Sequence, residues 1–337
     1  MRPMEVPGRP RAAFDDRSAN LQRTSGWERY SRSLLHALAG RVQPLGLAAP
    51  TMRRRVETDW VTLPGARRRN GLWTVPLHLP TYPPTPLLRG PLVWTVHDLT
   101  WWFHPETSSA AGRVYYRPLA SLALRHRDIT WVTPSHQVRR EMLERFALSP
   151  EAVVATPLGV SALPTSEPYT ADRPYILSVG TLEPRKNIGL LLEAYARSAV
   201  RLTHDLRLIG RLGWGVELPT DVILMTSVDD RALSALYRGA DALVSPSIYE
   251  GFGLPLIEAM SVGLPVLCSD IPVYREVTGG LAQYFSVETS DELVDLLNAL
   301  GDDTEVERER RRRWAARFTW EACAESTLNA YKRAAGA

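Results

Sequence analysis

The sequence predicts a parallel α/β protein built from two doubly wound, Rossmann-like halves that face a central cleft. The chain has 337 residues, which is more than one hydrophobic core usually serves. Short apolar runs alternate with helical patterns throughout, as in parallel βαβ units. The pattern also restarts after a proline-rich stretch at 161–174, which favours an interdomain linker there. We therefore expect an N-terminal domain over 1–165 and a second domain over 166–320.

The first half contains four predicted strands and three predicted helices. The strands cover 12–14, 92–96, 129–132 and 153–155. The helices cover 27–38, 112–125 and 135–145. Ser135 is expected to cap the last of these helices, because a serine hydroxyl can accept a hydrogen bond from a free backbone N–H of the first turn.

The second half repeats this alternation more regularly. Its predicted strands cover 175–179, 206–209, 222–225, 242–244 and 265–267. Its predicted helices cover 188–197, 231–238, 255–261, 290–300, 308–317 and 321–333. Two such halves would place a ligand in the cleft at the carboxyl ends of the strands.

Composition narrows the class of protein. Hydrophobic residues make up 45% and charged residues 23%, which is ordinary for a soluble globular protein. The apolar runs are too short to span a membrane, and the N-terminus lacks the apolar core of a secretory signal, so a cytoplasmic location is expected. Cys268 and Cys323 are expected to be buried thiols in a reducing compartment. A net charge of +3 is too small to indicate nucleic acid binding.

Basic residues gather in three arginine runs, at 53–55, 67–69 and 310–313. Each run is expected to be a solvated face or loop. A peripheral contact with anionic lipid at the inner membrane face is the alternative interpretation.

The segment 245–260 carries the strongest chemical pattern. A strand is expected to end before it, and Pro255 stands where the first position of a helix would lie. Gly251 and Gly253 would let a ligand approach the backbone, and the helix N-terminus would favour a phosphate. Glu250 precedes this loop and Glu258 is expected in the first helical turn, where they could accept hydrogen bonds from sugar hydroxyls. An ordinary glycine-containing turn with exposed glutamates is the competing interpretation.

A second cluster, 178–187, follows the first strand of the second half. Arg185 and Lys186 would lie at the carboxyl edge of that strand, where two cations can neutralise a diphosphate leaving group. An exposed basic turn is the alternative. It is weakened because Lys186 is one of only two lysines in the chain.

The first half offers weaker candidates. His97 ends a buried strand and could bind a hydroxyl, although a structural histidine is an equally good interpretation. The loop Thr24-Ser25-Gly26 precedes a helix and could lend N–H groups to a diphosphate. Aromatic residues at 101–103 could form an apolar wall for a substrate, or could belong to the core.

Taken together, these segments resemble glycosyltransferase family 4, whose members are retaining enzymes of the GT-B fold. The similarity runs from about Asp15 to Tyr331 and is strongest in the second half. The motifs that carry it are 95–98, 105–106, 132–135 and 157–160 in the first half, and 180–187, 208–211, 230–241, 246–260, 265–272 and 275–276 in the second.

The resemblance implies a role for each candidate residue. Arg185 and Lys186 would hold the donor diphosphate, Glu250 would contact the donor sugar, and Glu258 would hold the ribose hydroxyls. His97 would face the transferred sugar. The remaining implied donor-site residues are Gly26, Gly180, Thr181, Gly210, Arg211, Ser227, Val228, Gly251, Phe252, Gly253 and Leu254. Thr181 stands where some relatives carry an arginine, and the helix 321–337 would pack back on the N-terminal domain.

The implied activity is metal-independent transfer of a hexose from a nucleotide-diphospho-sugar, without a further cofactor. GDP-mannose is the first expectation for the donor and a UDP-sugar the second. The acceptor is left open among a glycan, a lipid and a natural product. The alternatives are a sugar-nucleotide-binding regulator without catalysis, and an epimerase or hydrolase on the same fold.

Overall fold

A computed structural model of the chain describes residues 12–21, 26–48, 55–108, 112–126, 128–161, 163–213, 217–301 and 303–336. Thr24 and Ser25 of the predicted loop, and residues 53 and 54 of the first arginine run, lie outside the described residues. The chain divides into two compact units. Unit 1 comprises 1–102, 108–158 and 320–337, and unit 2 comprises 103–107 and 159–319.

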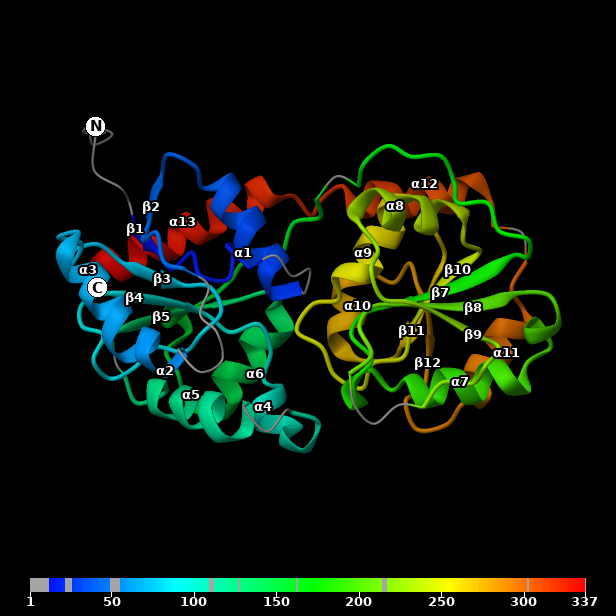
Figure 1. Ribbon diagram of the computed structural model, residues 1–337, viewed down its shortest axis with the longest axis horizontal. Coiled ribbons are helices and arrows are strands. Elements are labelled where there is room, and N and C mark those ends of the chain that lie inside the picture. Colours follow the sequence, from blue (N-terminus) through cyan, green and yellow to red (C-terminus); the bar gives the residue numbers. More distant parts are fainter. Residues whose placement is uncertain are drawn as a thin grey trace. The chain divides into compact units, whose positions relative to one another are not determined.

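Unit 1 contains a six-stranded sheet in which all paired strands are parallel. The strand order is β2-β1-β3-β4-β5-β6. The strands are β1 (Ala12–Phe14), β2 (Val42–Pro44), β3 (Leu77–Leu79), β4 (Leu92–Thr95), β5 (Ile129–Thr133) and β6 (Val153–Ala155). The helices are α1 (Gly26–Ala37), α2 (Arg55–Glu57), α3 (Leu63–Arg69), α4 (Thr100–Phe103), α5 (Arg117–Ala123), α6 (His136–Phe146) and α13 (Trp320–Gly336). Figure 1 shows α13, at the red end of the colour scale, beside α1 and the strands of unit 1, and it packs against α1, β4, β5 and β6.

The predicted elements of unit 1 are largely found. Ser135 caps α6 as expected, because its hydroxyl accepts a hydrogen bond from the N–H of Val138 at 3.1 Å. The predicted helix 112–125 is instead a π-helical segment, Gly112–Tyr116, followed by α5. Pro118 has no N–H to continue the helical hydrogen bonds across that junction. Strands β2 and β3 and the helical segment 55–69 were not predicted.

Unit 2 also contains a six-stranded sheet with parallel pairing. The order is β12-β11-β10-β7-β8-β9 (Figure 1). The strands are β7 (Tyr175–Val179), β8 (Asp205–Ile209), β9 (Val222–Met225), β10 (Ala242–Ser245), β11 (Val266–Ser269) and β12 (Gln283–Phe285). The helices are α7 (Ile188–Arg197), α8 (Asp230–Gly239), α9 (Leu254–Ser261), α10 (Pro272–Thr278), α11 (Asp291–Asn298) and α12 (Glu305–Ala315). Two parallel sheets with helical connections confirm the predicted Rossmann-like architecture.

Each sheet has a point at which the direction of winding reverses. In unit 2 the six strands follow the dinucleotide-fold order, and the reversal lies between β7 and β10. In unit 1 it lies between β1 and β3. Loops diverge from the carboxyl ends of the strands at such a point and leave a crevice, so these two positions are where functional residues are expected.

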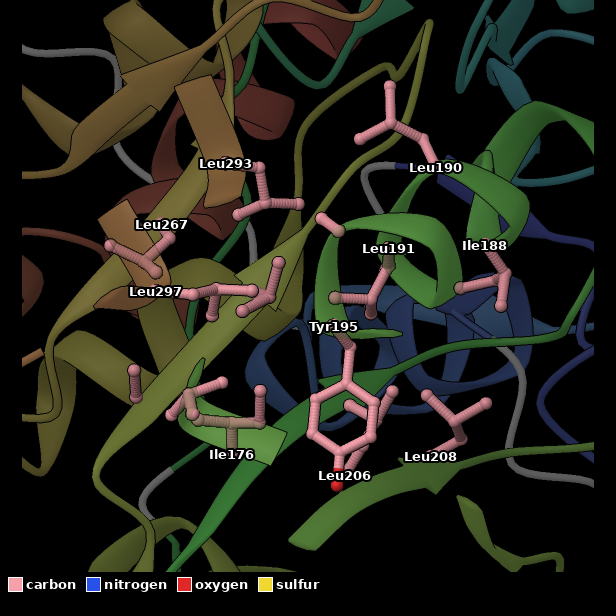
Figure 2. Packing of buried hydrophobic residues seen from close by; sticks show 14 of the residues in the cluster. Ile176, Ile188, Leu190, Leu191, Tyr195, Leu206, Leu208, Leu267, Leu293 and Leu297 are labelled. Carbon is pink, nitrogen blue, oxygen red and sulfur yellow. The ribbon is translucent and has the colours of Figure 1, made fainter. Parts of the chain in front are cut away.

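The core of unit 2 fixes the strands that carry its loops. Figure 2 shows apolar side chains of β7, β8 and β11 packed against those of α7 and α11. The labelled residues are Ile176, Ile188, Leu190, Leu191, Tyr195, Leu206, Leu208, Leu267, Leu293 and Leu297. The match between the 3.6-residue period of α7 and this stripe explains why 188–197 was predicted with the observed bounds.

The arginine runs are less solvated than predicted. Arg67 is fully buried, and its guanidinium donates to backbone carbonyls, so it is not part of a solvated face. Arg311 is also buried and donates to the carbonyl of Gly263 at 2.9 Å. Both thiols, Cys268 and Cys323, are free and buried as predicted. None of the helices in the described ranges is long and apolar enough to cross a membrane.

Candidate functional site

The reversal point of the unit 2 sheet brings two loops together. After β7 the chain makes a 3₁₀ turn, Pro184–Lys186, and Asn187 then adopts a left-handed conformation (φ 50°) before α7 begins. This turn places Arg185 and Lys186 beside the carboxyl end of β7. The loop after β10 is tied to it by the N–H of Ile248, which donates to the Arg185 carbonyl at 3.0 Å.

Three charged side chains from these loops form one cluster, which we call the Glu250 cluster: Arg185, Lys186 and Glu250. The two carboxylate oxygens of Glu250 bind different cations. Oε2 contacts Arg185 at 2.7 Å, and Oε1 contacts Lys186 at 2.5 Å. The three side chains are 10–17% exposed, so the cluster is largely buried yet reachable from solvent.

Neighbouring groups complete the hydrogen bonding of the cluster. The hydroxyl of Ser247 donates to Glu250 Oε1 at 3.0 Å. Arg185 also donates to the Tyr249 carbonyl and to Glu183, each at 2.8 Å. Burial opposes ionisation of Glu250, but Arg185 and Lys186 outweigh it and lower the pKa of Glu250 to about 2. The carboxylate is therefore ionised at neutral pH, and together with Glu183, which also pairs with Arg185, it balances the charge of the two cations.

Two glycines let the strand ends approach closely at this edge. Gly180 follows β7 with φ 148°, and Gly210 follows β8 with φ 145°. A Cβ on Gly210 would lie 2.0 Å from the Gly180 carbonyl oxygen, which no side chain tolerates. Gly180 also lines a small pocket of about 10 Å³, together with Thr181, Lys186 and Ser247.

Helix α9 begins beside the Glu250 cluster. It starts at Leu254 rather than at the predicted Pro255, which occupies the second helical position. Gly253 adopts φ 107° there, and a Cβ would lie 2.8 Å from the ring of Tyr274. Because the helix starts one residue early, Glu258 lies in its second turn and not in the first as predicted.

Glu258 is separate from the Glu250 cluster in its contacts. It is 3% exposed, and it accepts a hydrogen bond from the hydroxyl of Tyr237 at 3.0 Å. Of the loop residues between the two glutamates, Phe252 is buried against Phe318, with ring centroids 5.6 Å apart.

The other predicted donor-site residues of unit 2 lie along the same sheet edge. Arg211 follows β8 and is exposed. Ser227 and Val228 follow β9, where Ser227 is exposed and Val228 is partly buried. In the sheet, β8 is next to β7 and β9 is next to β8, so these residues lie on the opposite side of β7 from β10.

His97 of unit 1 follows β4 and is partly buried. Its Nε2 donates to the carbonyl of Pro80 at 2.7 Å, and its ring packs edge-on against Tyr30 at 4.7 Å. Burial lowers the pKa of His97 to about 4, against the opposing effects of the Pro80 carbonyl and Asp98. The ring is therefore neutral, with its proton on Nε2 and a lone pair on Nδ1. Gly26, the other candidate in unit 1, is the first residue of α1.

The aromatic residues at 101–103 do not act as one surface. Trp101 is buried and stacks on Phe146 with centroids 6.0 Å apart, so it belongs to the core. Phe103 is 41% exposed. The hypothesis of a continuous acceptor wall from these residues is not supported.

Several residues of the site were missed at the sequence level. Glu183 and Ser247 both contact the Glu250 cluster, and both stand inside the motifs already recognised, so their spacing could have indicated them. Tyr237 could not be found in this way, because it is an aromatic residue of an amphipathic helix and nothing in its pattern separates it from the core.

Comparison with known proteins identifies the family. Residues 163–317 match the family model described as "Glycosyl transferases group 1". The chain is 34% identical to O-antigen chain mannosyltransferase B of Escherichia coli over 227 residues, which is 60% of each chain and so less than two thirds of that relative. It is 30% identical to the phosphatidyl-myo-inositol mannosyltransferase of Mycobacterium leprae over 269 residues, covering 73% of this chain and 68% of the relative.

Solved structures establish the fold. HepE of Anabaena, solved in complex with UDP and glucose, superposes with a TM-score of 0.71 over 95% of this chain and 99% of its own, at 17% identity. This likeness, with the two six-stranded parallel sheets, confirms the expected GT-B fold. From the family model and the extent of the mycobacterial match, we conclude that the chain belongs to the glycosyl transferases group 1 family.

Proposed function

We propose that this protein is a retaining glycosyltransferase of family 4 that moves a hexose from a nucleotide-diphospho-sugar to a hydroxyl acceptor. Unit 2 would bind the donor and unit 1 the acceptor. The observation that carries this proposal is the Glu250 cluster at the reversal point of the unit 2 sheet, where one carboxylate holds two cations beside the start of α9. Membership of the family supports it.

The cluster suggests how a donor diphosphate would bind. Without donor, Glu250 occupies both cations. A diphosphate offers two negative charges in a geometry that suits a guanidinium and an ammonium, so it would compete with Glu250 for Arg185 and Lys186. The N–H groups at the start of α9 would add further donors. Binding would then release Glu250 to contact the donor sugar, where its negative charge can support a developing oxocarbenium ion.

The identity of the donor is inferred from the relatives. Both named curated relatives are mannosyltransferases, which favours mannose as the sugar and GDP as the nucleotide. A UDP-sugar is the second choice, and HepE was solved with UDP. Glu258 would hold the ribose, His97 would face the transferred sugar, and the residues after β8 and β9 would border the base.

The chemistry would proceed by front-face attack. The acceptor hydroxyl would attack the anomeric carbon on the side of the leaving phosphate, and the phosphate oxygen would take its proton. Arg185 and Lys186 would stabilise the charge that gathers on the diphosphate, in place of a metal ion. The sugar would keep its anomeric configuration.

Turnover measurements test the assignment. We expect Lys186→Ala and Glu250→Ala each to lower donor turnover at least about tenfold, because each removes a charge that the transition state needs. Thermal shift with GDP and UDP first shows which nucleotide binds. Sugar donors of that nucleotide are then tested for turnover, with products detected by mass spectrometry. Lys332→Ala is the matched control, since Lys332 is the other lysine and is exposed on α13.

The outcomes separate the alternatives. Full activity in either site variant would overturn the role of the Glu250 cluster. Nucleotide binding without any turnover would indicate a regulator, and release of free sugar with no acceptor product would indicate a hydrolase. If a chelator abolishes turnover and a divalent metal restores it, Arg185 and Lys186 do not replace a metal ion at the diphosphate.

A further inference from the structure

The reversal point of the unit 1 sheet is closed to ligands. Asp15 and Arg17, which follow β1, pair with each other and with Asp59, and all three side chains are 1–3% exposed. Ser18 and Thr81 fill the space next to them and are each 2% exposed. Among the residues that the structure describes, groups that follow β4, the strand beside β3, are the next candidates for a ligand of unit 1.

An exposed tryptophan stands over those groups. Trp27, in the first turn of α1, lies nearly parallel to the ring of His97, with centroids 5.8 Å apart and planes 17° apart. It also stacks on Tyr116 at 6.3 Å. These contacts hold the indole in place, yet 41% of the residue remains exposed. The indole is therefore held in a fixed orientation with part of its surface accessible, as an aromatic side chain that binds a ligand must be.

Hydrogen-bond acceptors adjoin this ring. His97 donates through Nε2, which leaves the lone pair of Nδ1 as an acceptor. Asp98 accepts from the N–H of Thr100 through Oδ1 at 2.8 Å, and Oδ2 has no partner among the residues that the structure describes. Asp98 is the residue directly after His97, on whose ring Trp27 stacks.

Among the described residues, the charge that follows β4 disfavours an anionic ligand at this ring. Asp98 supplies a negative charge, and His97 and Tyr116 are neutral. The nearest arginine along α1, Arg29, is two positions from Trp27, and residues so spaced point to different sides of a helix. The carboxylate of Asp98 would repel a phosphate or carboxylate. A sugar ring, by contrast, has an apolar face that can stack on Trp27 and hydroxyls that can donate to Asp98 and His97.

We propose that Trp27 is the acceptor platform of the enzyme: the acceptor ends in a neutral sugar ring, which stacks on the indole of Trp27 and donates a hydroxyl to Asp98. The inference rests on the proposed function, because it assigns the acceptor class of that same reaction. It selects a glycan end over a phosphate-bearing lipid or an apolar scaffold. His97 keeps its role toward the transferred sugar.

Indole N–H resonances of the full chain test this directly. The Trp27 signal is assigned by its loss in Trp27→Phe, and that of Trp73, which is 38% exposed in the same unit, serves as the internal control. Methyl α-D-mannopyranoside is expected to shift the Trp27 signal and leave that of Trp73 in place. Inorganic phosphate and cyclohexylmethanol, which lacks the ring hydroxyls, are expected to shift neither.

Affinity gives the second measurement. Trp27→Ala is expected to weaken binding of the mannoside about tenfold, and Trp27→Phe, which keeps an aromatic face, by less than about threefold. Trp73→Ala is expected to leave it unchanged. A Trp27 signal that moves no more than that of Trp73, or that responds equally to cyclohexylmethanol or phosphate, would overturn the proposal.

The same samples keep the two proposals apart. GDP binding is followed in parallel by thermal shift. If the wild type neither binds GDP or UDP nor turns over a donor, the proposed function is refuted, independently of the shift of the Trp27 signal. If donor turnover is normal but the Trp27 signal does not shift on addition of the mannoside, only the acceptor platform is refuted.

Discussion

The two sheets carry buried charge clusters at equivalent places, yet the clusters differ in composition and in solvent access. The Arg17 cluster (Asp15, Arg17 and Asp59) lies at the reversal point of the unit 1 sheet, and the Glu250 cluster lies at that of unit 2. In the first, two carboxylates surround one cation at 1–3% exposure, and Tyr115 donates to the remaining oxygen of Asp59 at 2.8 Å. In the second, two cations share the carboxylate of Glu250 at 10–17% exposure, and Arg185 also pairs with Glu183 at 2.8 Å.

The difference shows that buried charge alone does not mark a functional site. The Arg17 cluster is sealed, and all four of its carboxylate oxygens accept a hydrogen bond, so an incoming group finds neither room nor an available acceptor. The Glu250 cluster adjoins a small pocket, and under the proposed function its cations exchange Glu250 for a diphosphate. Solvent access and an exchangeable partner are the properties that separate a structural ion pair from a binding one.

The largest effect is expected when the sealed cluster is broken. Arg17→Met should lower the free energy of unfolding of unit 1 by about 4 kcal/mol, because it leaves two carboxylates buried without a cation. Hydrogen–deuterium exchange of the β1 and β3 amides in the full chain would measure it. Lys186→Ala should cost less than about 1 kcal/mol, since Glu250 keeps Arg185. Equal losses in the two variants would contradict the distinction drawn between the clusters.

An intermediate effect is expected from acid. Glu250 has a pKa of about 2 in the fold, below the value of about 4.3 in an unfolded chain. Its ionised form therefore stabilises the fold above about pH 4.3, and this stabilisation, on the order of 3 kcal/mol, is lost as the pH falls toward 2. The stability difference between wild type and Glu250→Gln should shrink over that range, as followed by exchange of the β7 and β10 amides. A constant difference would show that Glu250 is not held ionised by the two cations.

The smallest effect is expected at the edge of the Glu250 cluster. Ser247→Ala removes one hydrogen bond to Oε1, while Lys186 stays on the same oxygen, so unit 2 should lose about 1 kcal/mol. Chemical unfolding of the full chain measures it, with Ser121→Ala as an exposed control. A loss as large as that of Glu250→Gln would mean that the serine, rather than the cations, holds the carboxylate.

The sequence predicted unit 2 better than unit 1, for physical reasons. Helix α7 and strand β7 were predicted with their observed bounds, because the apolar period of α7 matches a buried stripe and the apolar run of β7 is buried in the sheet. Strand β3 has three residues and lies between Pro76 and Pro80, so no period could reveal it. The helical segment 55–69 is interrupted by a π-helical turn, which removes the regular spacing on which prediction depends.

The candidate site was also predicted better in unit 2 than in unit 1. Arg185, Lys186 and Glu250 were singled out correctly as neighbours, because residues after parallel strands meet at one edge. Their direct pairing was not foreseen, since Glu250 was expected to face sugar hydroxyls and not cations. Trp27 was not singled out at all, because exposure and ring stacking depend on tertiary packing that a single sequence does not express.

The buried Arg67 acts as a non-covalent crosslink. Its guanidinium donates to carbonyls on both sides of a chain loop, among them Val75 at 2.9 Å, Arg89 at 2.6 Å and Pro91 at 3.2 Å, so one side chain closes a loop of 24 residues ahead of β4. A disulfide would restrict that loop in a comparable way, but only under oxidising conditions. The two thiols of the chain lie in different units and are free. Arg67 therefore holds the approach to β4, and with it the strand that ends beside His97, equally firmly in any redox environment.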